Sequence, residues 1–430
     1  MLIRRIAVLG MAVLVSLLAA SPAGASSFQP QGRAALLIDG NTGQILYQQN
    51  GQARNFPAST TKLLTALVAV EHGKLDQMVK VSTEAVDQPW DSSSCYLEAN
   101  EEQRLDYLLH GLLLASGNDC AIAIAEGVTG GNSQQFMDWM NETARRVGAA
   151  NSHFTNPHGL HEPDHYTTAL DLALISRAAL ANPTVRKIAG TREFFWPGKS
   201  ERNGIYYNHN QMLVAYEGTV GGKTGFTEEA GLTLVSAAER DGRYLVGIVM
   251  GEQWKSEQYN DMIALLDMGF SDFETQVLVK NGTTFGEVPV TEGTAQSVPV
   301  IITQDFKVSA PRGGKSRLVT QTKLDSTVAA PVEAGQKVGT LEVREGDRLL
   351  AALPLVAQAG VDKKPALAAS VAGTALTVLK WAIGAFGSLL VFRTVVKTTR
   401  RVFRRSRRRN AGLRPANDRN RGTLNMYRTK

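Results

Sequence analysis

Three short segments of this chain carry residues that could together transfer an acyl group. In the first, Ser59 stands three residues before Lys62. A serine hydroxyl is a weak nucleophile until a neighbouring group accepts its proton. A lysine accepts a proton only when it is neutral, and burial or a second cation, here Lys223, lowers its pKa toward that state. Because residues three apart share one face of a helix, the pair predicts a nucleophile, Ser59, with Lys62 as its general base.

The second segment, Ser116-Gly117-Asn118, follows a run of leucines that predicts a buried helix. A glycine after that run ends the helix and leaves two polar side chains at its end. We expect the Ser116 hydroxyl to relay a proton between Lys62 and the leaving amine. We expect the Asn118 amide to hold a substrate amide. Taken alone, such a tripeptide is most often an ordinary turn.

The third segment opens a predicted strand and comprises Lys223, Thr224, Gly225 and Phe226. The Lys223 ammonium and the Thr224 hydroxyl offer a cation and a hydrogen bond to a substrate carboxylate. Gly225 lets an extended substrate lie against the backbone as an added strand. The backbone amides of Ser59 and Phe226 would form an oxyanion hole, in which each donor contributes ~3 kcal/mol.

These residues need rigid elements to hold them. Pro57 fits the first turn of a helix, and the apolar residues that follow predict a helix as far as His72-Gly73. The leucines within 108–114 predict the second helix. The glycine-rich segment 221–227 predicts a strand, and the apolar residues 232–235 predict the strand that follows it.

The sequence changes character near Phe270–Phe273. Before this point, helical periodicity alternates with short strand-like runs; after it, short apolar strands are separated by turn residues. Glu345-Gly346-Asp347 predicts a hairpin between the last two of these strands. We therefore predict a catalytic domain over residues 26–272 and a small all-β domain over residues 273–360.

The amino-terminal residues 1–25 have the pattern of a secretory signal peptide. Two arginines precede an apolar run from Ile6 to Ala20, and Ala23-Gly24-Ala25 provides a small-x-small cleavage site. The apolar run is short for a membrane span. We expect the catalytic domain to lie outside the cytoplasm.

A second apolar stretch covers residues 366–392 and is interrupted by one charge, Lys380. A helix of this length measures about 40 Å, enough to cross a membrane with some tilt. The basic residues that follow would keep the tail, 393–430, on the cytoplasmic side. The alternative is a helix that lies in the membrane interface with Lys380 facing water. Both alternatives predict a membrane anchor.

The net charge of +6 is unevenly distributed. Residues 393–430 contain fourteen Lys and Arg and a single acidic residue, Asp418, whereas the rest of the chain has more acidic than basic residues. Anionic lipid headgroups explain a basic tail beside an apolar helix better than nucleic acid does. We therefore expect membrane lipids, and no nucleic acid, as partners of the tail.

Two further groups of residues could carry chemistry. Cys95 and Cys120 fall in the exported part, where they could form a disulfide or remain two buried thiols. Four histidines, at positions 153, 158, 161 and 165, crowd one stretch, but their spacing matches no common zinc pattern. We expect a loop of hydrogen-bonded histidines that walls the active-site cleft, with no metal site and no cofactor.

Together these motifs resemble those of the serine-type D-alanyl-D-alanine carboxypeptidases, which are low-molecular-mass penicillin-binding proteins. The resemblance covers about residues 30–272 and, more loosely, the β domain. The segments that carry it are Pro57–Lys62, Leu114–Asp119, Phe154–Leu160, His165–Ala169 and Gly222–Thr227.

This resemblance implies an α/β (α+β) catalytic domain of the penicillin-binding and β-lactamase-like kind, with a central antiparallel sheet between helical clusters. It also implies a small all-β domain and a C-terminal membrane helix after it. The implied reaction removes the terminal D-alanine from peptidoglycan stem pentapeptides through an acyl-enzyme on Ser59, which water hydrolyses. β-Lactams would inhibit by acylating the same serine.

One departure from the family keeps other functions open. The family commonly has an arginine where residues 251–258 of this chain have only Lys255. A D,D-endopeptidase that cuts peptidoglycan cross-links is therefore one alternative. A β-lactamase is another, although no Glu-x-x-x-Asn segment is evident after Asn118. The third is a non-catalytic sensor of β-lactams or peptidoglycan.

Overall fold

The computed structural model describes residues 28–198, 204–365 and 367–409, so the predicted signal peptide lies outside the described residues. Contacts between residues divide the chain into two units. The first extends to Val288 and also contains Val298–Ser326 and Ala334–Ala359. The second contains Pro289–Ser297, Thr327–Glu333 and the chain from Gly360 onward.

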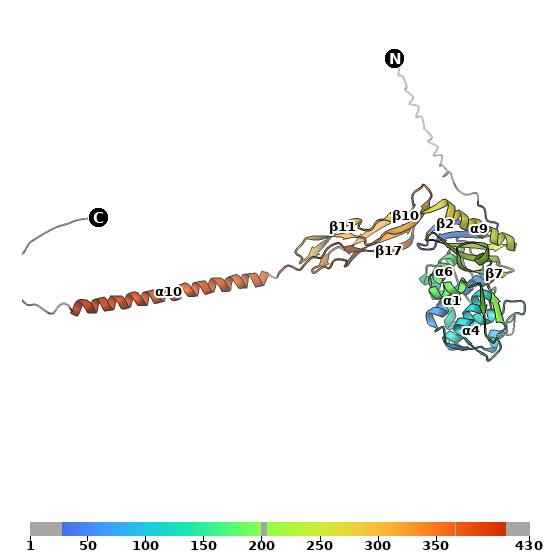
Figure 1. Ribbon diagram of the computed structural model, residues 1–430, viewed down its shortest axis with the longest axis horizontal. Coiled ribbons are helices and arrows are strands. Elements are labelled where there is room, and N and C mark those ends of the chain that lie inside the picture. Colours follow the sequence, from blue (N-terminus) through green and yellow to red (C-terminus); the bar gives the residue numbers. More distant parts are fainter. Residues whose placement is uncertain (1–27, 199–203, 366, 410–430) are drawn as a thin grey trace, which may run out of the picture. The chain divides into compact units, whose positions relative to one another are not determined.

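A five-stranded antiparallel sheet is the centre of the first unit, with the strand order β2-β1-β9-β8-β7. Because β1 pairs with β9, the two ends of the catalytic region meet in the middle of this sheet (Figure 1). The strands are β1 (Ala34–Asp39), β2 (Ile45–Gln49), β7 (Thr219–Thr227), β8 (Gly231–Arg240) and β9 (Arg243–Glu252).

Helices and short hairpins complete the catalytic region. The helical segments are η1 (Ala58–Thr61), α1 (Lys62–His72), α2 (Thr83–Val86), α3 (Leu105–His110), η2 (Gly111–Ala115), α4 (Asn118–Thr129), α5 (Ser133–Arg146), α6 (Ala169–Ala181), α7 (Pro183–Ala189), α8 (Met212–Ala215) and α9 (Lys255–Asp272). The short strands are β3 (Met78–Lys80), β4 (Glu102–Arg104), β5 (Glu193–Phe195) and β6 (Ile205–Tyr207).

The two faces of the sheet bury different helices. Leu37 and Leu245 point to one face, where they pack with apolar residues of α9. Leu36, Ile38 and Ile248 point to the other face, toward α1, α4 and α6. Figure 1 shows α9 and this helical cluster on opposite sides of the sheet. Successive strand residues alternate between faces, so a strand that is apolar throughout, such as β1, contributes to both cores.

Side chains cap the helices that support the sheet. Thr168 accepts a hydrogen bond from the backbone amide of Asp171 at the start of α6. The Asn182 side chain accepts from two backbone amides of α7, and Pro183 takes the first helical position. Both arrangements satisfy amides that have no partner inside the helix.

Short strands follow the catalytic region, as the sequence predicts. The hairpin predicted at Glu345-Gly346-Asp347 joins β16 to β17. The buried hydroxyl of Ser309 donates to the Asp39 carboxylate, with 2.6 Å between the oxygens, and so links a strand of this region to β1. The strands are β10 (Phe273–Val279), β11 (Thr284–Thr291), β12 (Ser297–Ile301), β13 (Phe306–Pro311), β14 (Val319–Leu324), β15 (Val328–Ala329), β16 (Lys337–Glu345) and β17 (Arg348–Ala357).

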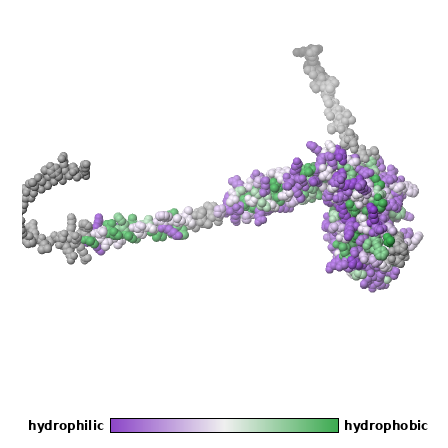
Figure 2. Space-filling view, viewed as in Figure 1, coloured by the Kyte–Doolittle hydropathy of each residue, from purple (hydrophilic) through white to green (hydrophobic). Residues whose placement is uncertain are grey.

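The second unit contains a short parallel pairing, between Val290 of β11 and Val328 of β15, and a long helix, α10 (Leu367–Arg409). Within α10, the 30 residues Gly373–Val402 are long and apolar enough to cross a membrane. Figure 2 shows apolar side chains along this helix. The helix does not end where the basic residues begin at Arg393, but continues through them to Arg409.

Candidate active site

Ser59 lies in the 3₁₀ turn η1, immediately before α1 begins at Lys62. The sequence predicts that both residues share one helix face, and the structure brings them together, with 2.9 Å between Lys62 Nζ and Ser59 Oγ. The turn is unusual because Ala58 has a positive φ of 48°. A residue with a Cβ rarely adopts this backbone conformation, so the neighbours of Ala58 must hold it in place.

The amine of Lys62 is fully buried and contacts three oxygen atoms. Besides Ser59 Oγ, it donates to Asn118 Oδ1 at 2.7 Å and to the backbone carbonyl of His158 at 2.8 Å. The last two oxygens can only accept hydrogen bonds. A neutral amine has two hydrogens, and these satisfy the two acceptors. Its lone pair is then left for the hydroxyl of Ser59, the one partner that can donate.

Burial lowers the pKa of Lys62 well below the 10.5 of an ordinary lysine. The positive charge of Lys223 lowers it further, as the sequence predicts, and the Asp119 carboxylate opposes this in part. Burial also lowers the pKa of Lys223, to about 7. The site therefore favours a neutral Lys62, which is the form that can accept the proton of Ser59.

Ser116 and Asn118 lie at a sharp break between two helical segments. One turn of π-helix, η2, ends at Ala115, and Ser116 itself has the left-handed conformation, with φ of 64°. We expected the glycine to make this turn, but Gly117 has an ordinary φ of −55°. Gly117 is needed for space instead, because a Cβ there would lie 2.7 Å from Cys95 Sγ.

This break in the helix directs the Asn118 side chain toward Lys62, and Asn118 Oδ1 accepts a hydrogen bond from Lys62 Nζ. The Asn118 side chain thus holds the Lys62 amine, a contact that we did not predict. The Ser116 hydroxyl forms no hydrogen bond with the residues that the structure describes, although Ser116 is almost completely buried.

β7 brings the third segment against Ser59. It is the last strand of the sheet, paired with β8 alone. A Cβ at Gly225 would lie 2.9 Å from the backbone nitrogen of Ser59, so only glycine allows this approach. Lys223 is buried and donates to the carbonyl of Thr224, while Thr224 is half-buried and the Phe226 side chain is exposed.

A loop from Phe154 to Leu160, part of the histidine-rich stretch that we expected to wall the cleft, lies against the turn that carries Ser59. A Cβ at Gly159 would lie 1.9 Å from the carbonyl oxygen of Ala58, and Gly159 has a φ of +90°. Thr65 Oγ1 on α1 donates to the carbonyl of Pro157 at 2.6 Å. These two contacts with the loop backbone hold both the loop and the strained turn before Ser59.

Two histidines near this wall are neutral, of which His165 is buried and His158 half-buried. Burial lowers the pKa of both His158 and His165 to about 3. The amide of Thr155 donates to His165 Nδ1, so Nε2 carries the hydrogen and donates to Thr61 Oγ1 at 2.9 Å. His165 therefore fixes the residue next to Lys62 by an uncharged hydrogen bond.

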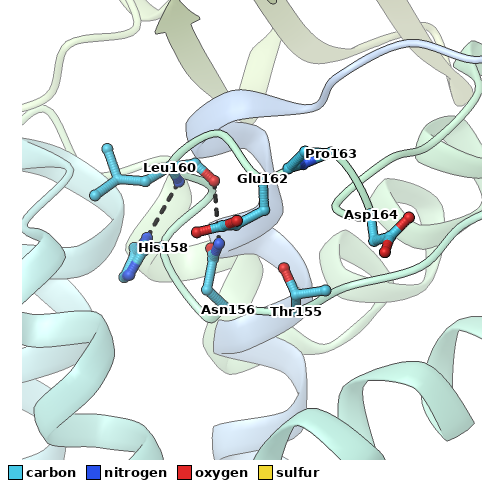
Figure 3. A pocket seen from close by; sticks show the side chains of 7 residues that line it. All are labelled: Thr155, Asn156, His158, Leu160, Glu162, Pro163 and Asp164. Atoms are coloured by element: carbon cyan, nitrogen blue, oxygen red, sulfur yellow. Dashed lines mark hydrogen bonds between the residues drawn. The ribbon is translucent and has the colours of Figure 1, made fainter.

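A cavity of about 420 Å³ lies beside the same loop and is lined by Thr155, Asn156, His158, Leu160, Glu162, Pro163 and Asp164 (Figure 3). The side chain of His158 lines this cavity, and its backbone carbonyl accepts a hydrogen bond from Lys62. The ring nitrogen Nδ1 accepts from the amide of Leu160, and the Asn156 side chain donates to the carbonyl of Leu160. The side chains that form the cavity are thus held by the loop itself.

An arginine approaches the segment 251–258 from elsewhere in the chain. Arg33 lies so close to Gly251 that a Cβ there would be 2.3 Å from its Nε. The Arg33 guanidinium donates to the carbonyls of Glu229 and Ala230, in the turn between β7 and β8. Arg33 and Gly251 are far apart in the sequence and are brought together only by the pairing of β1 with β9. The segment 251–258 alone therefore gives no sign of this arginine.

Comparison with known proteins identifies the family. The sequence profile described as D-alanyl-D-alanine carboxypeptidase matches residues 21–253, more than half of the chain. The chain belongs to this family. A second profile, described as the C-terminal domain of penicillin-binding protein 5, matches residues 273–363. The family and the fold class predicted from the sequence are thereby confirmed, including the all-β domain.

Characterised relatives match over most of their length. The D-alanyl-D-alanine carboxypeptidase DacF of Bacillus subtilis is 30% identical, over 79% of this chain and 88% of its own. DacA of Escherichia coli is 31% identical, over 75% of this chain and 81% of its own. Among solved structures, penicillin-binding protein 5 of Haemophilus influenzae has a TM-score of 0.65 and 29% identity, covering 79% of this chain and all of the other.

We predict that Gly159→Ala inactivates the site. The added methyl group must displace the carbonyl of Ala58 and with it the turn that carries Ser59. A displacement of about 1 Å at a reacting group costs on the order of 100-fold in rate. The measurement is the rate of acylation by a fluorescent penicillin.

Gly148→Ala is the matched control. Gly148 has a similar φ of +92°, but the nearest atom to an added Cβ is a side-chain atom of Leu174 at 3.6 Å. This variant should lose stability yet keep its acylation rate. Equal loss of acylation in both variants would contradict a specific contact between Gly159 and Ala58.

We also predict a pH dependence set by the two lysines. Acylation needs neutral Lys62, so its rate should rise with pH through an apparent pKa well below 10.5. Lys223→Gln removes a charge that disfavours protonated Lys62, so the rising limb should move to higher pH. Lys280→Gln, at an exposed position, should leave the limb unchanged. A limb that stays in place in Lys223→Gln would show that the lysines are not coupled.

Proposed function

We propose that Ser59 is the nucleophile with which this D-alanyl-D-alanine carboxypeptidase removes the terminal D-alanine from peptidoglycan stem pentapeptides. The observation that carries this proposal is the environment of the Lys62 amine. Two fixed acceptors take its hydrogens, and its remaining contact is the hydroxyl of Ser59. A serine that is paired with a neutral, buried base is activated for attack on a carbonyl.

In the first step, Ser59 Oγ attacks the carbonyl between the two terminal alanines as Lys62 Nζ takes its proton. The developing oxyanion would be bound by the backbone amides of Ser59 and Phe226. The contact between Gly225 and the Ser59 amide supports this assignment, since it places β7 directly against the nucleophile. Donors that are fixed before the reaction stabilise the new charge without reorganisation.

Departure of D-alanine requires a proton on the leaving amine. Lys62 gained this proton in the first step, and we assign the relay to the hydroxyl of Ser116. Ser116 is held beside Asn118, which contacts Lys62. Water then hydrolyses the acyl-enzyme, with Lys62 again accepting a proton. A β-lactam would acylate Ser59 through the same first step.

The substrate carboxylate would bind Lys223 and Thr224, on a strand whose glycines admit an extended peptide. A carboxylate next to Lys223 favours the charged ammonium, so substrate binding raises the pKa of Lys223 from about 7. Because residues 251–258 contain no arginine, D,D-endopeptidase activity is the second candidate function. It requires a site that accepts a peptide amide where a carboxypeptidase binds a carboxylate.

We predict that Ser59→Ala abolishes both D-alanine release from a defined pentapeptide and labelling by fluorescent penicillin. The variant lacks the hydroxyl that forms the ester, while Lys62 keeps its other two partners. Ser326→Ala, at an exposed position, is the control and should retain both activities. D-Alanine release by Ser59→Ala would disprove the mechanism.

Mass spectrometry of the products separates the two candidate activities. The wild-type enzyme should shorten uncross-linked pentapeptides by one residue and leave cross-linked dimers intact. Conversion of dimers to monomers at a comparable rate would show a D,D-endopeptidase.

We further propose that the domain is exported and anchored to the membrane by α10. The apolar side chains at 389–392 occupy four successive helical positions and therefore face all directions around the axis. An interfacial helix is apolar on one face only, so this pattern favours a membrane span. The basic residues that follow would lie against anionic lipid headgroups on the cytoplasmic side.

We predict that the full chain stays in the membrane fraction after washes with high salt and alkaline carbonate, and that only detergent releases it. These washes remove proteins that are held by charge or at the interface. A chain that ends at Pro365 should be recovered in the soluble fraction. Release of the full chain by either wash would contradict a membrane span.

A further inference from the structure

Two cysteines from separate segments meet directly beneath the Ser116–Asn118 break. Cys95 lies in the loop between α2 and β4, and Cys120 lies in the first turn of α4. Both are completely buried. Their sulfur atoms and a carboxylate oxygen of Asp119 all lie within 4.8 Å of one another.

The backbone around the two cysteines is held by one carboxylate. Asp119 Oδ1 accepts from the amide of Cys95 at 3.0 Å and from the amide of Cys120 at 2.8 Å. Amides that share one acceptor oxygen hold the two backbone segments close together, and the two sulfur atoms lie within 4.8 Å of each other. The bond would require the sulfurs to approach to about 2 Å.

Two glycines lie beside both sulfur atoms. A Cβ at Gly111 would lie 2.8 Å from Cys95 Sγ and 2.7 Å from Cys120 Sγ. A Cβ at Gly117 would lie 2.7 and 3.1 Å from the same two atoms. The two glycines thus leave a common space that the sulfurs share, next to the active-site turn.

We propose that Cys95 and Cys120 form a disulfide that ties the loop before β4 to the helix start that carries Asn118. This proposal rests on the export of the domain, since disulfides persist in oxidising compartments. Because both thiols are buried in the folded protein, the bond forms while the chain is folding after export.

The oxidant is a thiol–disulfide oxidoreductase or a small-molecule disulfide. One cysteine thiolate attacks the oxidant's disulfide and releases one thiol of the oxidant, which gives a mixed disulfide. The second cysteine then attacks the sulfur of the first and releases the other thiol. The two cysteines lose two hydrogens in total, and the oxidant is reduced to two thiols.

A metal ion is the competing occupant of this cluster, and the hydrogen bonds of Asp119 disfavour it. Its two oxygens accept from the amides of Cys95, Leu97 and Cys120 and from Ser94 Oγ. A carboxylate engaged in this way has little capacity left for a cation, and structural zinc takes four ligands. The disulfide needs nothing from Asp119 beyond the contacts it already makes.

The test starts with the full chain, exported through its own signal and purified in detergent without reductant. It is unfolded, treated with iodoacetamide before or after reduction, and weighed by mass spectrometry. The disulfide predicts no alkylation before reduction, two alkylated cysteines after it, and a cross-linked Cys95–Cys120 peptide in an unreduced digest. Two alkylated cysteines before reduction, or one zinc ion per chain that a chelator removes, would overturn the proposal.

Measurements of Tm distinguish a disulfide from two thiols that only pack against each other. Cys95→Ala, Cys120→Ala and the double variant should all lose a similar amount in Tm, about 6–10 °C for a loop of this length. Wild-type protein that is reduced while unfolded and refolded in dithiothreitol should have a Tm near these values, and the double variant treated in the same way should be unchanged. A wild-type Tm that this treatment leaves unchanged would contradict the bond. Penicillin labelling of the same samples reports on Ser59 separately, so failure of either proposal can be recognised.

Discussion

The burial of one amine among three oxygens governs the architecture of this active site. A protonated Lys62 would satisfy all three partners as a donor and leave Ser59 inactive. Burial and the nearby charge of Lys223 oppose that state. The neutral amine keeps its two fixed acceptors, Asn118 and the carbonyl of His158, and turns its lone pair toward the serine. In the proposed mechanism, the base is therefore oriented by groups that take no proton themselves.

This arrangement requires three segments, far apart in the sequence, to meet at backbone contact distance. Gly225 of β7 and Gly159 of the loop both press against the turn that carries Ser59, at points where any side chain would collide. The histidines beside the turn are uncharged, so they add no positive charge to a site that already has two lysines. Close backbone approach fixes the positions of the reacting groups, while burial and the charge of Lys223 favour the neutral form of Lys62.

The sequence is informative where function rests on side chains and much less so where it rests on backbone. Ser59, Lys62 and Asn118 are recognisable because their chemical types and spacing imply a reaction. The carbonyl of His158 is invisible to such reasoning, since every residue has a carbonyl and only the fold selects one. The left-handed turn at Ser116 was also missed, because propensity assigns such a conformation to the glycine beside it.

The same limit applies to the sheet and the helices. Apolar strands and a leucine-rich helix were predicted from periodicity, and the family resemblance supplied the antiparallel sheet. The approach of Arg33 to Gly251 depends on the pairing of β1 with β9, which joins segments more than two hundred positions apart. Local sequence patterns do not predict a contact between residues so far apart in the chain.

The position of β7 at the end of the sheet has a cost for the protein in solution. A terminal strand presents unpaired backbone groups to any extended chain, not to substrate alone, and such strands are common starting points for aggregation. Most proteins protect them with charges or prolines, whereas β7 has glycines and a buried lysine where substrate must fit. Peptide turnover and resistance to self-association thus make opposite demands on one strand. A protein whose β7 is covered by a bound peptide would also be less prone to aggregate.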